Sequence, residues 1–428
     1  MQIIELIEAT GAKVLAEVDK DLDVKISTDT RTIQKGDFYL PLKGASFDGE
    51  KFINQAFEKG AIGAFCTGDN GTLQVKDTLT AYLQLANYRR KKLNFTVVAI
   101  TGSSGKTTTK ELAASVLSEK FRTFKTPLNH NNEIGFCQTI FEAPDDILVL
   151  EMGMRGLGEI ELLSKYAEPD ITIISNVGTA HIGRLGSREN IAKAKCEIVK
   201  YQRGNIFIAH DDELIKKTVQ FSGKKIFYSI KDVKILEKDT HYSKFEYYGN
   251  IYELNVGGDY NIENALSAIN TGLALRMKVN EIQSGLKKYA PIEKRWEAVN
   301  AGGVEIINDS YNANPESMRA FIDTIFELYE KPVVILGDMG ELGEDEIKYH
   351  SELGKYINSH KNLRQDAEIL SIGKLSKYIT DGVTNCPAKH FETIEQAVDY
   401  IKNKDTKVQL FLKASRSMKF ERIIEELK

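Results

Sequence analysis

Residues 97–117 read VVAITGSSGKTTTKELAASVL and decide the fold of the central part of the chain. An apolar run ends in a glycine- and serine-rich loop, and a helical pattern follows, which we expect to form a helix over about residues 108–120. A full phosphate-binding loop has four residues between its first glycine and its Gly-Lys pair, but that first position is Ile100 here. The stretch is therefore either a shortened nucleotide loop or a serine-rich turn before an ordinary helix.

The order of residue types favours the nucleotide loop. Backbone amides of such a loop converge on a phosphate group at the positive end of the following helix. Lys106 can reach the terminal phosphates, and the hydroxyl of Thr107 suits Mg²⁺. We therefore expect a nucleoside triphosphate to bind Thr101, Gly102, Ser103, Ser104, Gly105, Lys106, Thr107 and Thr108.

The composition indicates a cytoplasmic protein. The 428 residues are 42% hydrophobic and 28% charged with a formal net charge of −4, so a general nucleic-acid surface is not expected. No apolar run reaches the ~20 residues of a membrane-spanning helix, and Glu5 and Glu8 stand where a secretory signal has lysines. Four scattered cysteines without CxxC spacing indicate neither a disulfide framework nor a zinc site.

Apolar runs and helical patterns alternate through two parts of the chain. In the central part, helical patterns separate FTVVAITG, DDILVLEMG, DITIISNVG and GNIFIAH, as in a parallel sheet covered on both faces. The pattern returns nearer the C-terminus in GVEIINDSYN, KPVVILGDMG, AEILSIG and VQLFLKAS. We predict an α/β protein with three domains at 1–93, 94–290 and 291–428. We also expect a hairpin turning at Gly249-Asn250, helices over 50–59 and about 261–277, and a linker over 287–299.

Polar residues that follow the apolar runs are candidates for chemistry, because ligands bind at the carboxyl ends of strands in open α/β sheets. Glu151 ends the run DDILVLE, and we expect His181, in ISNVGTAHIGRLGS, to end a strand as well. A carboxylate there suits Mg²⁺, whereas a lone loop histidine is more commonly solvated than a ligand. Lys195 lies in a lysine-rich helix whose charges indicate a solvated face, and an ammonium group serves a metal only if modified.

Taken together, the motifs resemble the ATP-dependent Mur ligases of peptidoglycan synthesis. AITGSSGKTTTK, LNHNNEIG, EMGMRGLGEI, ISNVGTAHIGRLGSRENIAKAK and GDYNIENALSAI look like the successive signatures of that family, whose phosphate loop is the short version. INDSYNANPESM, ILGDMGELGEDE and LKASRSMKFERI are similar to the member that adds D-alanyl-D-alanine to UDP-N-acetylmuramoyl-tripeptide. STDTRTIQKGDFYLPLKGASFDGEKFI resembles the UDP-binding domain of that member. The resemblance covers essentially the whole chain.

The resemblance implies a small α/β domain for the UDP-linked substrate and a central ATPase domain with a mostly parallel sheet. It also implies a C-terminal Rossmann-like domain that binds the D-alanyl-D-alanine acceptor. The expected activity is ATP-dependent amide-bond formation through an acyl phosphate, with two Mg²⁺ ions, in a cytoplasmic monomer. Whether the third residue of the tripeptide is diaminopimelate or lysine stays open.

The resemblance assigns roles to individual residues. Lys106, Glu151, His181 and Lys195 would be catalytic, and the last three, with Thr107, would hold magnesium; carbamylation would turn Lys195 into a carboxylate. The ATP site would also include Asn261, Asn264, Arg295 and Asp309; the UDP-substrate site Ser27, Asp29, Arg31 and Gly44; and the acceptor site Tyr311, Asn312, Lys413 and Arg416. The sequence departs from the family pattern at three positions. Tyr260 stands where the family usually has histidine, Cys137 where it has proline, and Ala414 where it has glycine.

Simpler interpretations of single residues stay open. Asn314 can be a helix cap, Arg295 a surface arginine of the linker, and Arg31 the partner of Asp29 in a turn. A sister ligase or a folylpolyglutamate synthase shares the loop and the metal residues, but we expect another motif in place of DSYNANP. A regulatory nucleotide-binding protein would not need the metal residues. A P-loop kinase explains neither the short loop nor the third domain.

Overall fold

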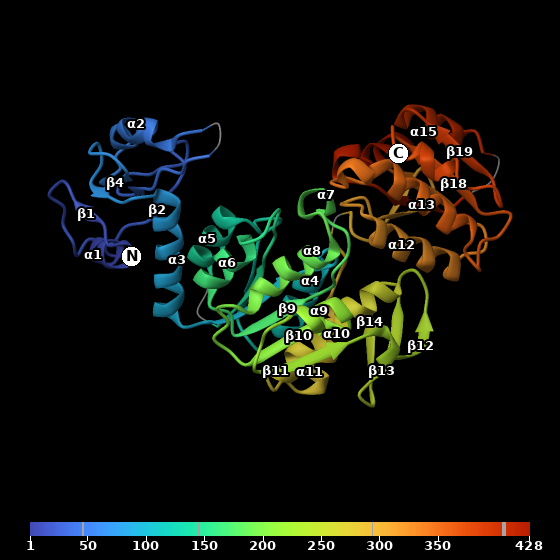
Figure 1. The fold of residues 1–428 in the computed structure, drawn as a ribbon, viewed down its shortest axis with the longest axis horizontal. Coiled ribbons are helices and arrows are strands. Elements are labelled where there is room, and N and C mark those ends of the chain that lie inside the picture. The colour runs from blue at the N-terminus through green and yellow to red at the C-terminus, as the bar shows by residue number, and fades with distance from the viewer. Residues whose placement is uncertain (45–46, 144–145, 293, 405–407) are drawn as a thin grey trace. The chain divides into compact units, whose positions relative to one another are not determined.

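The computed structural model describes residues 1–44, 47–143, 146–292, 294–404 and 408–428, and these form two compact units (Figure 1). The first unit comprises Met1–Thr96 and Thr126–Leu148, and the second comprises Val97–Lys125 and Val149–Lys428. Within the described ranges, every helix is too short or too polar to span a membrane. The three domain ranges stay a prediction.

A small five-stranded sheet organises the first unit. Its strand order is β1-β5-β4-β3-β2, with β1 antiparallel to β5 and the other pairs parallel. The side chains of Tyr39, Ile53 and Ala64 pack in its core. The elements are α1 (Ile3–Thr10), β1 (Lys13–Val14), β2 (Ile26–Ser27), β3 (Phe38–Tyr39), α2 (Ile53–Glu58), β4 (Gly63–Cys66), β5 (Leu73–Gln74), α3 (Thr78–Leu93) and α5 (Glu133–Glu142). The helix expected over 50–59 is a 3₁₀ turn, Gly49–Phe52, followed by α2.

A six-stranded sheet carries the phosphate-loop sequence. Its order is β11-β10-β9-β6-β8-β7, and β6–β9, β9–β10 and β10–β11 are parallel pairs. The side chains from Val97 to Ile100 are fully buried, which explains the unbroken apolar run of β6. The strands are β6 (Thr96–Thr101), β7 (Thr123–Lys125), β8 (Ile147–Glu151), β9 (Ile171–Ile174), β10 (Ile206–His210) and β11 (Lys224–Tyr228).

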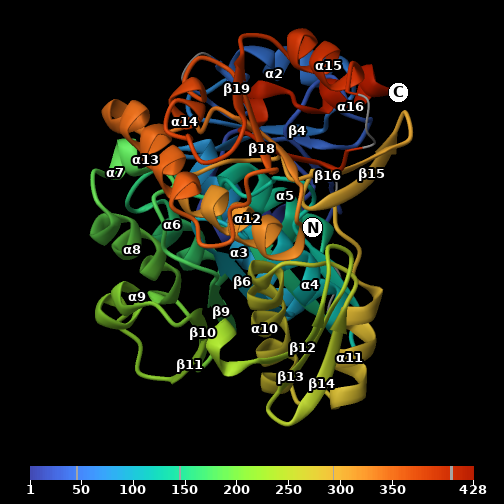
Figure 2. The same cartoon turned by 90° about the vertical axis from the view of Figure 1, so that its right-hand side faces the viewer.

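Helices of the second unit accompany this sheet. α4, the helix after the phosphate loop, packs against α10 and α11 (Figure 2). The expected ranges of these two helices are 108–120 for α4 and 261–277 for α10. Each helix begins two residues earlier and ends three residues earlier than expected. The helices are α4 (Lys106–Leu117), α6 (Glu159–Ala167), α7 (Ile182–Leu185), α8 (Arg188–Cys196), α9 (Glu213–Thr218), α10 (Asp259–Ala274) and α11 (Val279–Lys288).

The expected hairpin is present, with its turn one residue earlier than predicted. β13 (Ser243–Tyr247) and β14 (Asn250–Leu254) are antiparallel, and β12 (Lys234–Lys238) pairs with β13. Because Tyr247 faces Asn250, the turn residues are Tyr248 and Gly249, with φ of 47° and 71°. Two positive φ angles suit the tight two-residue turn that matches strand twist.

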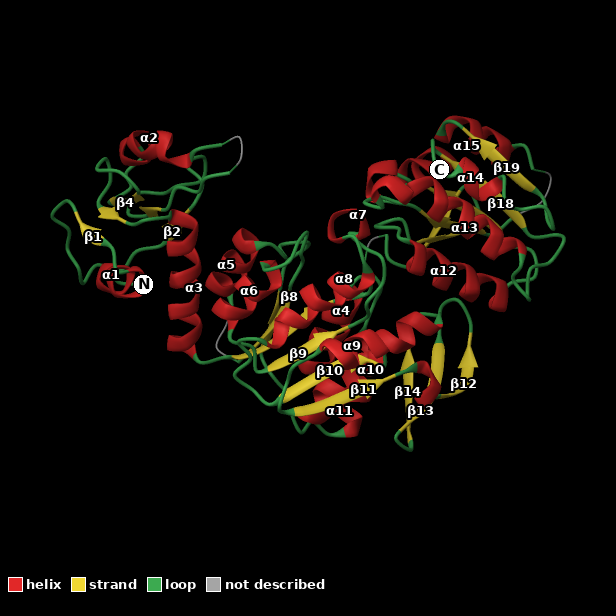
Figure 3. Ribbon diagram, viewed as in Figure 1, coloured by secondary structure: helices red, strands yellow, loops and turns green. Residues whose placement is uncertain are grey.

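The C-terminal sheet, of which Figure 3 labels β18 and β19, has the strand order β15-β16-β20-β17-β18-β19. β15 (Glu297–Ala301) is antiparallel to β16, and the other pairs are parallel. Since β15 begins inside the stretch 287–299, the linker prediction is wrong there. The remaining strands are β16 (Val304–Asn308), β17 (Val333–Gly337), β18 (Glu368–Ile372), β19 (Ala388–Phe391) and β20 (Leu410–Lys413). The helices are α12 (Pro315–Leu328), α13 (Glu346–Asn358), α14 (Lys377–Thr380), α15 (Ile394–Lys402) and α16 (Glu421–Leu427).

The four cysteines are free thiols. Cys66, Cys137 and Cys196 are buried, and Cys386 is partly buried. Burial raises the pKa of each thiol, to about 12 for Cys196 and about 11 for Cys386. These side chains therefore serve as small apolar groups in the packing.

Candidate active site

The phosphate loop is shaped by Gly105 and by its packing against α10. Gly105 has φ of 75° and precedes the first residue of α4, where the left-handed conformation favours glycine. A side chain there would also collide with the amide oxygen of Asn264. That oxygen accepts a hydrogen bond from the Thr109 hydroxyl at 3.2 Å. Asn264 thus lies against the loop, as its predicted place in the ATP site requires, whereas Asn261 donates to the Gly257 carbonyl at 2.7 Å.

Ser175 and Asn176, which follow the neighbouring strand β9, bind the short phosphate loop. Neither residue was predicted for the site. The Asn176 Oδ1 atom accepts from the backbone N–H groups of Ser103 and Ser104 at 3.1 and 2.9 Å. The Asn176 Nδ2 group donates to Ser104 Oγ at 2.8 Å, and the Ser175 hydroxyl donates to the Ser104 carbonyl at 2.6 Å. Ser175 and Asn176 directly follow β9, so the rule that directed attention to strand ends could have found them.

Lys106 and Lys110 lie one helical turn apart on α4. Lys106 donates to the Gly102 carbonyl at 2.9 Å; burial lowers its pKa, Arg295 lowers it further, and Glu151 and Glu341 oppose the shift. Lys110, which the sequence reasoning also missed, is buried with its Nζ atom 3.6 Å from Oε2 of Glu151. Glu151 ends β8, as predicted, and is itself buried.

Lys195 is buried, so the solvated-face interpretation is wrong for this residue. Its exposed fraction is 1%, while Lys193 on the same helix is exposed. Burial, with a further contribution from the charge of Lys106, places the pKa of Lys195 well below the ordinary value for lysine. Lys195 thus lies close enough to Lys106 to be affected by its charge, and both effects favour the uncharged form of its amine.

His181 lies in a loop, and the prediction that it ends a strand is wrong. β9 ends at Ile174, and His181 is the residue before α7, with φ of 66°. Its Nδ1 atom is 2.6 Å from Oε2 of Glu341, and its side chain is 19% exposed.

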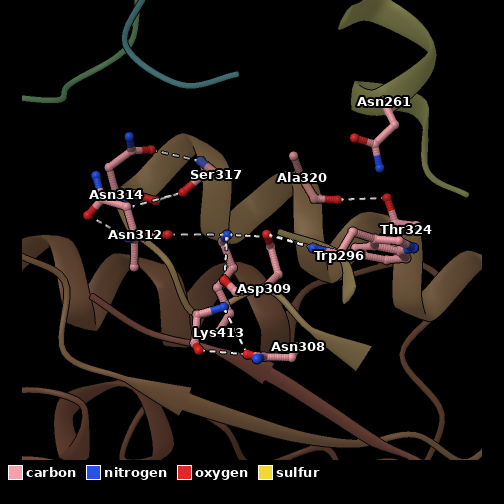
Figure 4. A network of polar contacts seen from close by, with 12 residues as sticks. Asn261, Trp296, Asn308, Asp309, Asn312, Asn314, Ser317, Ala320, Thr324 and Lys413 are labelled. Carbon is pink, nitrogen blue, oxygen red and sulfur yellow. Dashed lines mark hydrogen bonds and ion pairs between the residues drawn. The ribbon is translucent and has the colours of Figure 1, made fainter. Parts of the chain in front are cut away.

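Figure 4 shows a polar network at the end of β16 and β20. The buried Lys413 ammonium pairs with the Asp309 carboxylate and approaches the carbonyl oxygens of Asp309 and Asn312 at 3.4 Å each. Oδ1 of Asp309 accepts from the backbone N–H of Trp296 at 3.2 Å. Asp309, Asn312 and Lys413 are thus brought together, although we predicted them for two different ligands.

Two arginines cover the ring of Tyr311. The Arg295 guanidinium carbon is 3.8 Å from the ring centroid, and that of Arg416 is 5.3 Å away. Arg416 also donates to the Tyr311 hydroxyl at 3.3 Å. The buried Nε of Arg295 has no hydrogen-bond partner within the described ranges. The interpretation of Arg295 as a surface linker residue is therefore wrong, and the paired guanidinium groups suit an anionic ligand.

Models of known protein families match the parts of the chain that carry the phosphate loop and the Tyr311 cluster. Residues 100–272 match the Mur ligase middle domain, and residues 294–416 match the Mur ligase glutamate ligase domain. The UDP-N-acetylmuramoyl-tripeptide–D-alanyl-D-alanine ligase of Bacillus subtilis is 36% identical over 432 residues, which cover 94% of this chain and 92% of that protein. The chain belongs to the Mur ligase family.

Solved structures of relatives have the fold of this Mur ligase. A crystal structure of MurF from Acinetobacter baumannii matches with a TM-score of 0.89 and 28% identity, covering 100% of this chain and 98% of that chain. MurF from Thermotoga maritima in complex with ADP matches with a TM-score of 0.83 and 28% identity, covering 94% of this chain and 96% of that chain. The α/β fold class and the family resemblance are confirmed.

In the first unit of the Mur ligase, three of the four predicted UDP-site residues form one turn. Arg31 donates to both carboxylate oxygens of Asp29, with Nη2 2.6 Å from Oδ2, so the turn ion pair is present. Hydrogen bonds from the Arg31 side chain and backbone hold the pKa of Asp29 at about 2. Ser27 Oγ donates to the Asp29 carbonyl at 3.3 Å. The Gly44 N–H donates to the Phe47 carbonyl instead, at 2.8 Å, and among the described residues no backbone hydrogen bond links Gly44 to that turn.

The cap predicted for α12 is confirmed. Asn314 Oδ1 accepts from the backbone N–H of Ser317 at 2.9 Å, and the Ser317 hydroxyl is 3.1 Å from the Asn314 backbone nitrogen. Pro315 takes the first helical position. Asn314 therefore has a structural task whether or not its neighbours bind a ligand.

The residues predicted to hold magnesium fit it in part. Among the described residues, no three His, Cys, Asp or Glu side chains form a group that could hold a metal ion. The Thr107 hydroxyl and the Glu151 carboxylate are the hard oxygen donors that Mg²⁺ prefers. The Lys195 amine would need modification to join them, and His181 is paired with Glu341.

Proposed function

We propose that this Mur ligase adds D-alanyl-D-alanine to UDP-N-acetylmuramoyl-tripeptide, driven by conversion of ATP to ADP and phosphate. The observation that carries the proposal is the short phosphate loop, whose Lys106 interacts electrostatically with two buried residues, Glu151 and Lys195. The names of the relatives matched over nearly the whole chain support the choice of substrates. The proposal includes a monomer acting in the cytoplasm.

The chemistry begins with the terminal carboxylate of the tripeptide, which is a poor electrophile because it is anionic. Transfer of the γ-phosphoryl group to that carboxylate forms an acyl phosphate and releases ADP. The amine of D-alanyl-D-alanine then attacks the acyl carbon, an amide bond forms, and phosphate leaves. Phosphoryl transfer requires chiefly positioning and neutralisation of charge, which Lys106 and the nearby Arg295 would supply.

Thr107 and Glu151 would hold Mg²⁺, which when bound neutralises charge on the phosphates. Lys195 is suited to carbamylation because burial lowers the pKa of its amine and so favours the uncharged form that reacts with CO₂. Its nitrogen lone pair would form a bond to the carbon of CO₂, and loss of a proton would leave an anionic carbamate. The carbamate oxygens would then be available as metal ligands.

The C-terminal residues would bind the acceptor. Arg416 and Tyr311 present a guanidinium group and an aromatic face, and a guanidinium group pairs well with the carboxylate of a dipeptide. Lys413 and Asp309 would keep this loop in place, because they tie β20 to the DSYNANP segment. In the first unit, Arg31 would bind the diphosphate.

The test is phosphate release from ATP with UDP-N-acetylmuramoyl-tripeptide, with and without D-alanyl-D-alanine. We expect release that requires the dipeptide and falls at least about 100-fold in Lys106→Ala, as for other preorganised charges at a reacting phosphate. Turnover with a single amino acid or glutamate instead would indicate a sister ligase or a folylpolyglutamate synthase. ATP binding without turnover on any acceptor would favour a regulatory protein.

A further inference from the structure

The loop between β9 and α7, residues 175–181, faces the phosphate loop on one side. Besides the bonds made by Ser175 and Asn176, the backbone N–H of Gly178 donates to Ser103 Oγ at 2.9 Å. His181 stands at the end of this loop. Anything that fixes residues 175–181 therefore also fixes His181 relative to the phosphate loop.

On its other side, the same loop is held by Glu316. The Glu316 Oε2 atom accepts from the backbone N–H of Thr179 at 3.0 Å and from its hydroxyl at 2.8 Å. Glu316 lies in the first turn of α12, directly after the capped start of that helix. The cap on Asn314 thus also fixes where this carboxylate points.

A second contact joins α7 to the turn that leads into α13, and Figure 2 shows the two close together. A side chain on Gly183 would place its Cβ 2.5 Å from the nitrogen and 2.7 Å from the Cα of Gly343. The Gly183 N–H donates to the Glu341 carbonyl at 3.4 Å. Gly183 does not have a positive φ, so its lack of a side chain serves the close approach and not the backbone conformation.

His181 lies between these two contacts in a backbone conformation that needs support. Its φ of 66° is uncommon for a residue other than glycine and costs on the order of 1 kcal/mol or more. α7 has four residues and cannot impose that conformation alone. Thr179 and Gly183, each two residues from His181, are the points where the C-terminal segments hold it.

We propose that Glu316 and the turn Glu341–Gly343 are positioning residues, which hold the 175–183 segment and set the place of His181 beside the phosphate loop. The step from His181 to the metal rests on the proposed function together with the magnesium role that the family resemblance predicts for His181, while the step from these residues to the loop does not. The sequences NPESM and MGELG, which contain Glu316 and Glu341–Gly343, thereby receive a role in placing this loop. They make the C-terminal part of the second unit a component of the nucleotide site.

Hydrogen exchange tests the positioning step without any turnover. In the full-length protein with ADP and Mn²⁺, we expect the Thr179 amide to be protected in the wild type and to exchange at least about tenfold faster in Glu316→Ala. Glu344→Ala, which removes an exposed carboxylate close to the same turn, serves as the control and should not change this amide. Equal protection of Thr179 in wild type and Glu316→Ala would overturn the proposal.

Mn²⁺ binding in the presence of ADP, measured by electron paramagnetic resonance, tests the step to His181. We expect Glu316→Ala and Gly183→Ala each to weaken Mn²⁺ binding by about tenfold or more, the usual effect of losing a group that orients a metal ligand. Gly340→Ala is the matched control, since its Cβ would meet its nearest atom, Ser415 Oγ, at 3.5 Å, an ordinary contact. Unchanged Mn²⁺ affinity in both variants would refute the role of this contact in placing His181.

A double-mutant cycle keeps the test decisive if Gly183→Ala does not fold. Thr179→Val removes the hydroxyl that donates to Glu316. We expect Thr179→Val to weaken Mn²⁺ binding in the wild type and to have no effect once Glu316 is alanine. Fully additive effects would contradict the proposal. Intact Mn²⁺ and ADP binding with no ligase activity would count against the proposed function alone.

Discussion

Two lysines on one helix show how strongly the position of a residue determines its burial and its pKa. Lys193 and Lys195 are two residues apart on α8, so they point to nearly opposite sides of the helix, one exposed and the other buried. Burial disfavours the charged form of a lysine because the ammonium group loses its hydration, and this lowers the pKa of Lys195. The same residue type is thus a solvent-exposed charge at one position and a buried amine with a lowered pKa at the other.

We predict that Lys195 carries a carbamate in the active protein. Protein equilibrated with ¹³C-bicarbonate should show a carbamate signal by NMR that is absent in Lys195→Ala and retained in Lys193→Ala. Lys195→Ala should also lower ligase activity at least about 100-fold, since a preorganised charge at the site is lost. A carbamate signal that persists in Lys195→Ala would assign the modification to another lysine.

At the scale of elements, strands with a buried apolar run can be predicted from the sequence, whereas the edge strand β15 cannot. β6 lies within the run FTVVAITG, whose residues 97–100 are all apolar and fully buried. β15 falls in the stretch predicted as linker, because this edge strand alternates half-buried and exposed residues and has no apolar run. The contacts that hold the loops of the candidate site could not be predicted from the sequence either, because they join residues far apart in the chain. Asn176 meets Ser104 across 72 residues and Thr179 meets Glu316 across 137, and the topology alone brings such residues together.

The cap of α12 gives a stability prediction. Asn314→Ala should lower the free energy of unfolding by about 1 kcal/mol, because the N–H of Ser317 loses its acceptor. Asn314→Asp keeps an acceptor and should stay close to the wild type. The single tryptophan, Trp296, packs on Phe321 of α12 at 5.7 Å, so its fluorescence in a urea titration reports this region directly. Equal midpoints for both variants would argue against the cap.

A pair between β10 and α10 makes stability depend on pH. Burial lowers the pKa of His210, but the hydrogen bond to Glu263 at 3.2 Å and the nearby Asp211 and Asp212 outweigh it and raise that pKa above 6.5. A raised pKa in the folded protein means that the protonated ring is stabilising. This contribution is complete below pH 6.5 and is lost as pH rises through the pKa of the folded protein.

The measurement is the thermal midpoint between pH 6 and 9. We expect the midpoint of the wild type to fall over the lower part of that range more than that of Glu263→Gln, in which the histidine has lost its anionic partner. Parallel curves for the two proteins would show that another group is responsible.

At the scale of the whole molecule, the predicted substrate sites are divided between the two units. The turn of Ser27, Asp29 and Arg31 belongs to the first unit, and the phosphate loop and the Tyr311 cluster belong to the second. A change in the first unit should therefore affect one substrate and leave the others alone.

We predict that Arg31→Ala raises KM for the UDP-linked substrate about tenfold, the loss of roughly one charge-assisted hydrogen bond, without changing KM for ATP. Arg31→Lys keeps the charge and loses the planar fork, so its KM should lie between the two. Initial rates with each substrate varied in turn give these constants. An equal rise in KM for ATP would show that the sites are not separate.

The buried thiols make the molecule ready for site-specific dye labelling. Because their pKa values are raised, little reactive thiolate is present at neutral pH, and maleimides should react with them slowly. Cysteines introduced at the exposed positions Lys76 and Lys217, one in each unit, could be coupled to a donor and an acceptor fluorophore with the native cysteines left in place. Single-molecule energy transfer would then follow the distance between the units as ATP, the UDP-linked substrate and the dipeptide are added in turn.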